Sequence, residues 1–120
     1  MPRTHIQYTA GDCPIAGIVA IIGGRHKASI LLHLRDQPRR FNELKRLIPG
    51  ISQRMLTLQL RGLESDGVIC RTSDGAPSGV VLYAFTPHGC TLGPILEAMT
   101  EWWAQRHQLP STSVSSESVL

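Results

Sequence analysis

The 120-residue sequence has few cysteines, no long apolar run and none of the common catalytic motifs. Its three cysteines, Cys13, Cys70 and Cys90, are an odd number at long spacings with no C-x-x-C pair, which argues against a disulfide framework or a zinc knuckle. No apolar run reaches membrane-spanning length, and the first residues lack the positive-then-apolar order of a secretory signal. We therefore expect a cytoplasmic protein with free thiols and no membrane partner.

Signatures of enzymes and of metal sites are absent too. There is no Gly-rich phosphate loop, no G-x-S-x-G elbow and no recognisable pair of catalytic carboxylates. Nothing specific supports an enzyme with Cys13 or Cys90 as nucleophile and a histidine as base. His26 and His33 lie seven residues apart on one predicted helix, but no third ligand at metal-binding spacing accompanies them. The sequence predicts neither an enzyme nor a metal or other cofactor.

Composition and charge indicate one basic domain. With 42% hydrophobic and 18% charged residues, the chain can build one core but has little room for a second. Residues 1–61 contain ten Lys and Arg and three acids, a net charge of +7, whereas residues 62–120 contain two and six, a net −4. A basic half attracts a polyanion because neutralised phosphates release counterions, although such a run is more often a solvated face.

Two helices are predicted near the start of the chain. An almost wholly apolar segment closed by two glycines predicts a helix over 14–22, with Cys13 as its cap and Pro14 at its first position. Apolar spacing predicts a second helix over 25–36, and the Gln37-Pro38 step ends it.

The next segment has the pattern of a helix-turn-helix. RRFNELKRLIPG contains a short helix, in which Asn42 is either the cap or part of the first turn, and Pro49-Gly50 turns the chain before a helix capped by Ser52. The leucines of this last helix follow helical spacing and face inward, which leaves its polar side to enter a major groove. The predicted DNA-contacting residues are Ser52, Gln53, Arg54, Thr57, Leu58, Arg61, Lys45, Arg46, Arg40, Arg71 and Ser78, with Arg39 as a further backbone candidate.

Leu58 is the unusual member of this set. Helical projection places it on the side of Arg54 and Arg61. It is expected either to meet a thymine methyl group or to be an ordinary exposed leucine. A DNA contact is favoured for Arg54 because it lies in the first turn, whereas each cation around the turn is as readily a solvated side chain.

The segments at 68–73 and 80–86 are β-rich and predict a hairpin directly after the recognition helix. Such a ribbon is a wing, on which Ser78 and the loop amides can bind phosphate beside Arg71. The predicted fold is therefore mainly helical with a small β-hairpin wing, a dimeric winged helix-turn-helix.

A helix predicted from Pro87 to about Gln108 carries an apolar stripe too broad for one small core. A homodimer is favoured over a wholly intramolecular contact, because a two-fold dimer lets two recognition helices reach successive major grooves. The predicted interface residues are Ile15, Ile18, Val19, Ile22, Leu92, Ile95, Leu96, Met99, Trp102 and Trp103. The predicted organisation is an N-terminal arm over 1–12, the DNA-binding and dimerisation domain over 13–108 and a Ser-rich disordered tail over 109–120.

The motif order resembles one known family. CP near the start, IGG-R-H-K, PRRFNELKRLIPGIS, MLT, LRGLE-DGVI-R, Y-F-T-P-G and a C-terminal W resemble the HxlR-type regulators, a branch of the MarR-like winged-helix transcription factors. The resemblance covers roughly Cys13 to Trp102 and implies a homodimeric bacterial or archaeal DNA-binding regulator. The family usually has Gln where this chain has Leu58, Arg where it has Gln59 and an acidic residue where it has Leu82. The operator sequence therefore cannot be inferred from the family.

Cys13 has two interpretations. Unpaired N–H groups at a helix start favour a thiolate, whereas neighbouring Asp12 opposes one. The resemblance implies sensing of an oxidant or electrophile through a cysteine placed like Cys13, and the alternative is a packed cap residue. Cys70 and Cys90 are expected to be small buried side chains.

Together these features predict a homodimeric, sequence-specific regulator of transcription that binds double-stranded DNA and associates with the nucleoid. Repression is favoured because occupying a promoter needs no further contacts, and oxidation or alkylation of Cys13 is the expected switch. The alternatives are a winged-helix protein-interaction module and a ligand-responsive regulator without redox sensing. Binding of bulk DNA at low and moderate salt separates the first alternative from a DNA-binding protein.

Overall fold

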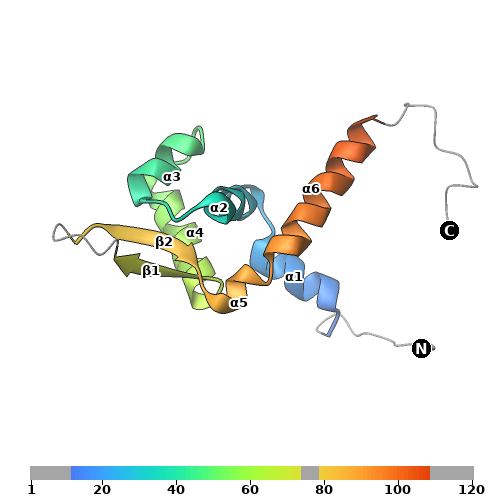
Figure 1. The fold of residues 1–120 in the computed structure, drawn as a ribbon, viewed down its shortest axis with the longest axis horizontal. Helices are drawn as coiled ribbons and strands as arrows, with labels where there is room; N and C mark the ends of the chain where they lie inside the picture. The colour runs from blue at the N-terminus through green and yellow to red at the C-terminus, as the bar shows by residue number, and fades with distance from the viewer. Residues whose placement is uncertain (1–11, 74–78, 109–120) are drawn as a thin grey trace, which may run out of the picture. The chain divides into compact units, whose positions relative to one another are not determined.

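The computed structural model describes residues 12–73 and 79–108, which contain six helices and two strands (Figure 1). In chain order these are α1 (Pro14–Ile22), α2 (Arg25–Asp36), α3 (Phe41–Leu47), α4 (Gln53–Ser65), β1 (Ile69–Ser73), β2 (Val81–Phe85), α5 (Pro87–Cys90) and α6 (Gly93–Gln108). The first two helices have the predicted bounds. The chain divides into two compact units after Cys90, so that α6 belongs to a unit of its own.

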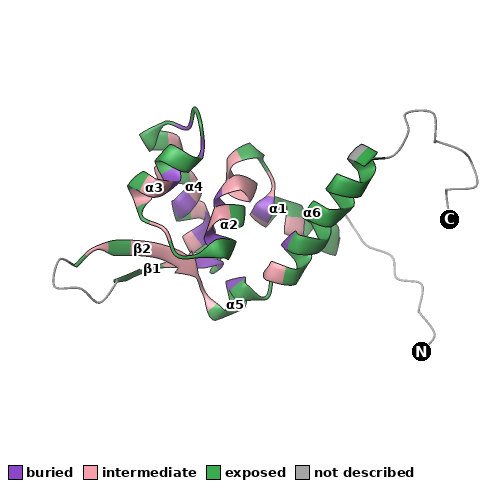
Figure 2. Ribbon diagram, turned by 45° about the horizontal axis from the view of Figure 1, so that its top comes forward, coloured by how far each residue is buried: buried purple, intermediate pink, exposed green. Residues whose placement is uncertain are grey.

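The core of the first unit is built by α2, α3, α4 and the start of β1 (Figure 2). Leu56, Leu60 and Leu63 are fully buried, as their helical spacing predicts. The other large side chains buried below 2% exposure are Ile30, Leu31, Leu44, Val68 and Ile69. Because the leucines of α4 recur about once per helical turn, one side of the helix packs inward and the opposite side remains outside.

Of the two predicted positions for Asn42, the structure has it in the first turn of α3 and not at the cap. The helix begins at Phe41 with Arg40 as its N-cap, and Asn42 is its second residue. Glu43 selects this start, because its Oε1 accepts a hydrogen bond from the Arg40 N–H at 3.0 Å. This is the acidic half of a capping box, in which the third helical residue reaches back to the cap.

The predicted hairpin is confirmed to within one residue at each end. The strands β1 and β2 pair antiparallel, with Ile69 opposite Phe85 and Ser73 opposite Val81. The structure also contains a β-bridge that was not predicted from the sequence. The Arg39 N–H donates to the Tyr83 carbonyl at 3.0 Å, and the Tyr83 N–H donates to the Arg39 carbonyl at 2.7 Å. This bridge attaches the wing to the connection between α2 and α3.

The single helix predicted from Pro87 to Gln108 is interrupted. It is replaced by the short α5, a turn at Thr91-Leu92, and α6. Pro94 supplies a local reason, because it has no N–H for the Cys90 carbonyl and its ring clashes with that carbonyl in a continuous helix. Cys90, expected to be buried, is exposed at the end of α5.

Candidate nucleic-acid interface

The joint between α3 and α4 orients the second helix. Ile48 and Ile51 are buried on either side of the turn and anchor it to the core. Between them Gly50 adopts a φ of 81°, in the left-handed region that favours glycine. Ser52 then caps α4 as predicted, since its Oγ accepts a hydrogen bond from the Met55 N–H at 3.0 Å. The start of α4 is thus held rigidly while its polar side remains exposed.

That polar side forms one continuous surface, which we call the reading face. Its residues line a hollow of about 550 Å³ and are Gln53, Arg54, Thr57, Leu58 and Arg61. Gln53, Arg54 and Arg61 are exposed, and neither arginine forms an ion pair within the described residues. Thr57 is partly committed to the helix, because its hydroxyl donates to the Gln53 carbonyl at 2.9 Å. The structure therefore brings the five predicted residues of α4 together.

The cations around the reading face fall into two groups. Arg40, Lys45 and Arg46 are exposed, and none of them is ion-paired in the part of the chain that is described. Arg39 is different, since its guanidinium lies 3.9 Å from both Asp36 and Glu43 and its Nε donates to the His33 carbonyl at 3.3 Å. Arg40, Lys45 and Arg46 are therefore available to contact an external anion, whereas Arg39 makes its contacts within the fold.

Arg71 is also engaged within the fold. Its Nε donates to the Glu64 carboxylate at 3.1 Å, which joins β1 to the last turn of α4. Tyr83 lies opposite Arg71 in β2, and its pKa is raised above the usual value by burial and then by the Glu64 carboxylate. This contact sets the angle of the wing against α4. Ser78, predicted at the wing tip, lies outside the described residues.

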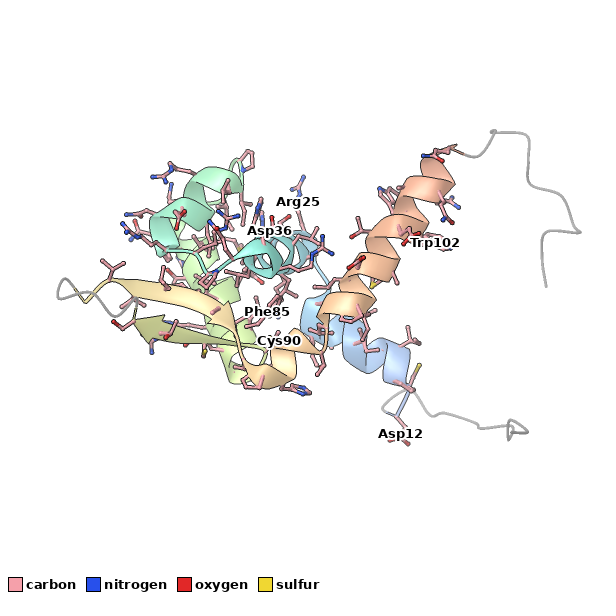
Figure 3. The ribbon with its side chains drawn as sticks, in the orientation of Figure 1. Asp12, Arg25, Asp36, Phe85, Cys90 and Trp102 are labelled. Atoms are coloured by element: carbon pink, nitrogen blue, oxygen red, sulfur yellow. The ribbon has the colours of Figure 1, made fainter. Side chains whose placement is uncertain are left out.

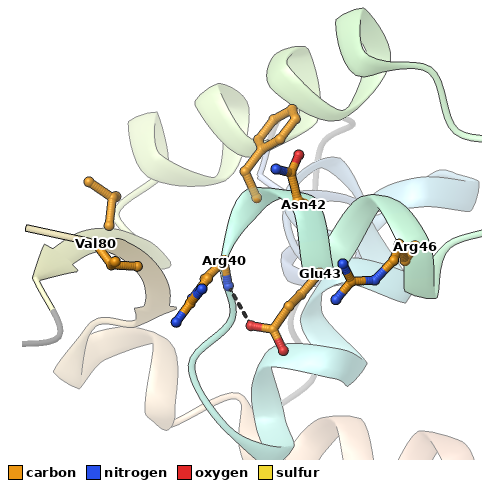
Figure 4. Close-up of a pocket in the computed structure, with 7 residues that line it drawn as sticks. Arg40, Asn42, Glu43, Arg46 and Val80 are labelled. Atoms are coloured by element: carbon orange, nitrogen blue, oxygen red, sulfur yellow. Dashed lines mark hydrogen bonds between the residues drawn. The ribbon is translucent and has the colours of Figure 1, made fainter. Parts of the chain in front are cut away.

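A second hollow lies between the start of α3 and the start of β2 (Figure 4). Arg40 and Arg46 lie on either side of Glu43 there, and Phe41, Val80 and Val81 supply apolar surface. Val80 and Val81 lie far from α3 in the sequence, so no local sequence pattern predicted the hollow. The strand pairing that brings Tyr83 to Arg39 also brings the valines to α3.

The predicted interface residues of α1 are divided between core and surface. Ile15 and Val19 are exposed, Ile18 is half-buried, and Ile22 is buried. Ile22 therefore packs within a single chain, and the predicted dimer interface stays a prediction. Cys13 is the half-buried N-cap of α1, and its side chain makes no capping hydrogen bond.

In the second unit, α6 carries large exposed apolar side chains. Met99, Trp102 and Trp103 are each more than half exposed, and Ile95 is 43% exposed (Trp102 is labelled in Figure 3). Leu96 is buried and Leu92 is half-buried. The guanidinium carbon of Arg106 lies 5.9 Å from the centre of the Trp102 ring, within the range of a cation–π contact.

The described residues also bear on metal binding and on membrane spanning. Among the described residues, no group of three or more His, Cys, Asp or Glu side chains is arranged to hold a metal ion. No helix of the described ranges is by itself long and apolar enough to cross a membrane. Together α1 and α2 are long and apolar enough, but the chain bends by 80° between them.

Comparison with known proteins gives consistent results. The family model described as HxlR-like helix-turn-helix matches residues 21–110. The chain is 46% identical over 103 residues to YdeP, an uncharacterized HTH-type transcriptional regulator of Bacillus subtilis, a match covering 83% of this chain and 80% of YdeP. Such regulators are not enzymes.

Solved structures of two regulators resemble the fold. The redox regulator HypR in its reduced form has a TM-score of 0.73 and 41% identity, covering 79% of this chain and 94% of HypR. Quinone-bound YodB from B. subtilis has a TM-score of 0.66 and 33% identity, covering 78% of this chain and 99% of YodB.

Proposed function

The chain belongs to the HxlR-like helix-turn-helix family of transcriptional regulators, and on that premise we propose that it is a homodimeric repressor whose reading face recognises operator DNA. The observation that carries this proposal is the exposed Arg54 in the capped first turn of α4, which forms no ion pair with any described residue. The first turn of a recognition helix is the part that reaches base edges.

The residue types of the reading face suit the major groove. A guanidinium such as that of Arg54 can donate two hydrogen bonds to the O6 and N7 atoms of guanine, and the Gln53 amide can pair with adenine. Thr57 retains an acceptor, because its hydroxyl hydrogen is used within α4. Arg40, Lys45 and Arg46 carry charge without fixed partners in the described structure, which suits contacts to phosphates.

Arg54→Ala is expected to weaken binding to a selected operator by about 1–3 kcal/mol and to relax the preference at one base pair. Lys45→Ala is expected instead to weaken binding to all DNA similarly and to reduce the slope of log K against log salt concentration by about one. The measurement is a titration of fluorescent operator and of unrelated DNA at several salt concentrations. The operator is obtained by selecting bound fragments from random-sequence DNA.

Arg35→Ala provides a matched control for this comparison. Arg35 is an exposed cation of α2 without an ion pair in the described ranges, and it is not part of the reading face. Its replacement should leave base preference unchanged. Wild-type affinity in both Arg54→Ala and Lys45→Ala would contradict the assignment of α4 to the major groove.

Dimerisation is supported by the exposed apolar side chains of α1 and α6. A single recognition helix reads only a few base pairs, and a two-fold dimer doubles the contacts on a palindromic site. Repression follows as the simplest outcome, because a dimer bound across a promoter obstructs it without contacting polymerase.

Regulation through Cys13 is the finer part of the proposal. The similarity to a protein named a redox regulator and to one solved with a bound quinone supports it. Cys13 occupies the N-cap position of a helix whose exposed residues we assign to the dimer interface, so added bulk there can rotate one recognition helix relative to the other. The Cys13 sulfur adds to the ring of a quinone and forms a thioether. Hydrogen peroxide instead oxidises the thiol to sulfenic acid with release of water.

Treatment of the wild type with benzoquinone or hydrogen peroxide is expected to reduce operator affinity at least tenfold, and Cys13→Ser is expected to resist both reagents. A thiol reductant should restore binding after peroxide but not after the quinone, because a thioether is not reduced by thiols. Cys70→Ser and Cys90→Ser are the matched controls and should respond as the wild type does. No loss in the wild type would favour a ligand-responsive regulator without redox sensing.

A further inference from the structure

An apolar side chain lies in the middle of the otherwise polar reading face. Leu58 is 53% exposed and lines the same hollow as Arg54 and Arg61. These three residues follow one another at i, i+4 and i+7 and therefore form one stripe along α4. An isolated exposed leucine is ordinary on a protein surface, but this one is flanked by two cations that have no ion pair within residues 12–73 and 79–108, on the surface assigned to DNA.

The neighbouring Thr57 leaves this part of the reading face without a hydrogen-bond donor. Its hydroxyl hydrogen is occupied by the Gln53 carbonyl at 2.9 Å, so Thr57 has no donor to offer a base. Between the guanidinium groups of Arg54 and Arg61, the stripe therefore presents hydrocarbon rather than a hydrogen-bond donor. Contact of Leu58 with the nitrogen and oxygen atoms of base edges would desolvate those atoms without replacing their hydrogen bonds.

One apolar group lies on base edges in the major groove, the C5 methyl of thymine. We propose that Leu58 reads thymine by covering this methyl, so that each operator half-site contains a thymine close to the base contacted by Arg54. This inference rests on the proposed function and adds a specificity determinant to it. The flanking arginines supply the charge complementarity that holds the leucine against DNA.

The geometry of α4 gives the spacing between the two bases. A helix rises about 1.5 Å per residue, so Leu58 lies about 6 Å further along the axis than Arg54. Base pairs are spaced about 3.4 Å apart. The thymine is therefore expected one or two base pairs from the position at which Arg54→Ala relaxes the preference.

Replacement of that thymine by deoxyuridine tests the proposal without altering the protein. Deoxyuridine keeps every hydrogen-bonding atom and removes only the methyl. We expect the wild type to bind the substituted operator about fourfold more weakly per half-site, the effect of exposing one buried methyl group. 5-Bromodeoxyuridine, which restores the volume of the methyl, should restore the affinity. Deoxyuridine at thymines outside the half-sites is the control on the DNA.

Leu58→Gln completes the test on the protein. This variant should lose the preference for thymine over deoxyuridine while retaining binding to unrelated DNA. Leu32→Gln is the matched control, since Leu32 is a partly exposed leucine of α2 and does not line the reading face. It should retain the preference of the wild type.

The failure of this inference is distinguishable from failure of the proposed function. A wild type that selects no sequence from random DNA contradicts the proposed function itself. A wild type that selects a consensus but binds deoxyuridine and thymine operators equally contradicts the role of Leu58. A selected consensus without a thymine within two base pairs of the Arg54-dependent position contradicts it as well.

Discussion

Replacing both Met99 and Trp102 by glutamate is expected to yield monomers whose operator affinity is lower by on the order of a hundredfold or more. Each side chain is more than half exposed on α6, and its burial against a second copy would become the burial of a charge. Loss of the partner removes the second half-site contact, which in the dimer is made at a high effective concentration. Sedimentation velocity and operator titration measure the two effects.

Ala104→Glu combined with Gln108→Glu is the control for added charge. Both residues are exposed on α6, on the side opposite the apolar stripe, so this variant should remain dimeric. A wild-type protein that sediments as a monomer at micromolar concentration would refute the homodimer without any variant. Monomeric Met99 and Trp102 variants that retain full operator affinity would refute the link between assembly and DNA binding.

Gly89→Ala is expected to lower the free energy of unfolding by about 2 kcal/mol or more, at the upper part of the range for overpacked sites. A Cβ at Gly89 would collide with the carbonyl of Val68 and meet the ring of Phe85. The carbonyl cannot move freely, because it accepts the Thr86 N–H at 3.0 Å. Thr86 also holds α5 in place, since its Oγ accepts the Gly89 N–H at 2.9 Å. Urea denaturation measures the change.

Gly62→Ala is the matched control for this substitution. Gly62 lies inside α4, where a Cβ would meet only the end of the flexible Lys27 side chain at 3.4 Å. Alanine in a helix interior should raise stability by about 0.5–1 kcal/mol relative to glycine. Equal stability of Gly89→Ala and the wild type would show that α5 does not pack against the start of β1.

Several elements were determined by short stretches of sequence. The bounds of α1 and α2, the cap at Ser52 and the inward leucines of α4 were predicted correctly, because each depends on residues within a few positions of one another. Helical hydrogen bonds and capping contacts have this short range. The end of α2 likewise follows from the backbone restriction that Pro38 imposes on the residue before it.

Other features were decided only by the tertiary structure. The bridge between Arg39 and Tyr83 and the ion pair of Arg71 with Glu64 join separate elements. Such contacts distinguish these cations from Arg54, which has no ion pair in the part of the chain that the structure describes. Burial of Ile22 and exposure of Leu58 also depend on how whole helices pack. Helical spacing assigns a residue to a side of its helix, but only packing against distant segments decides whether that side is covered.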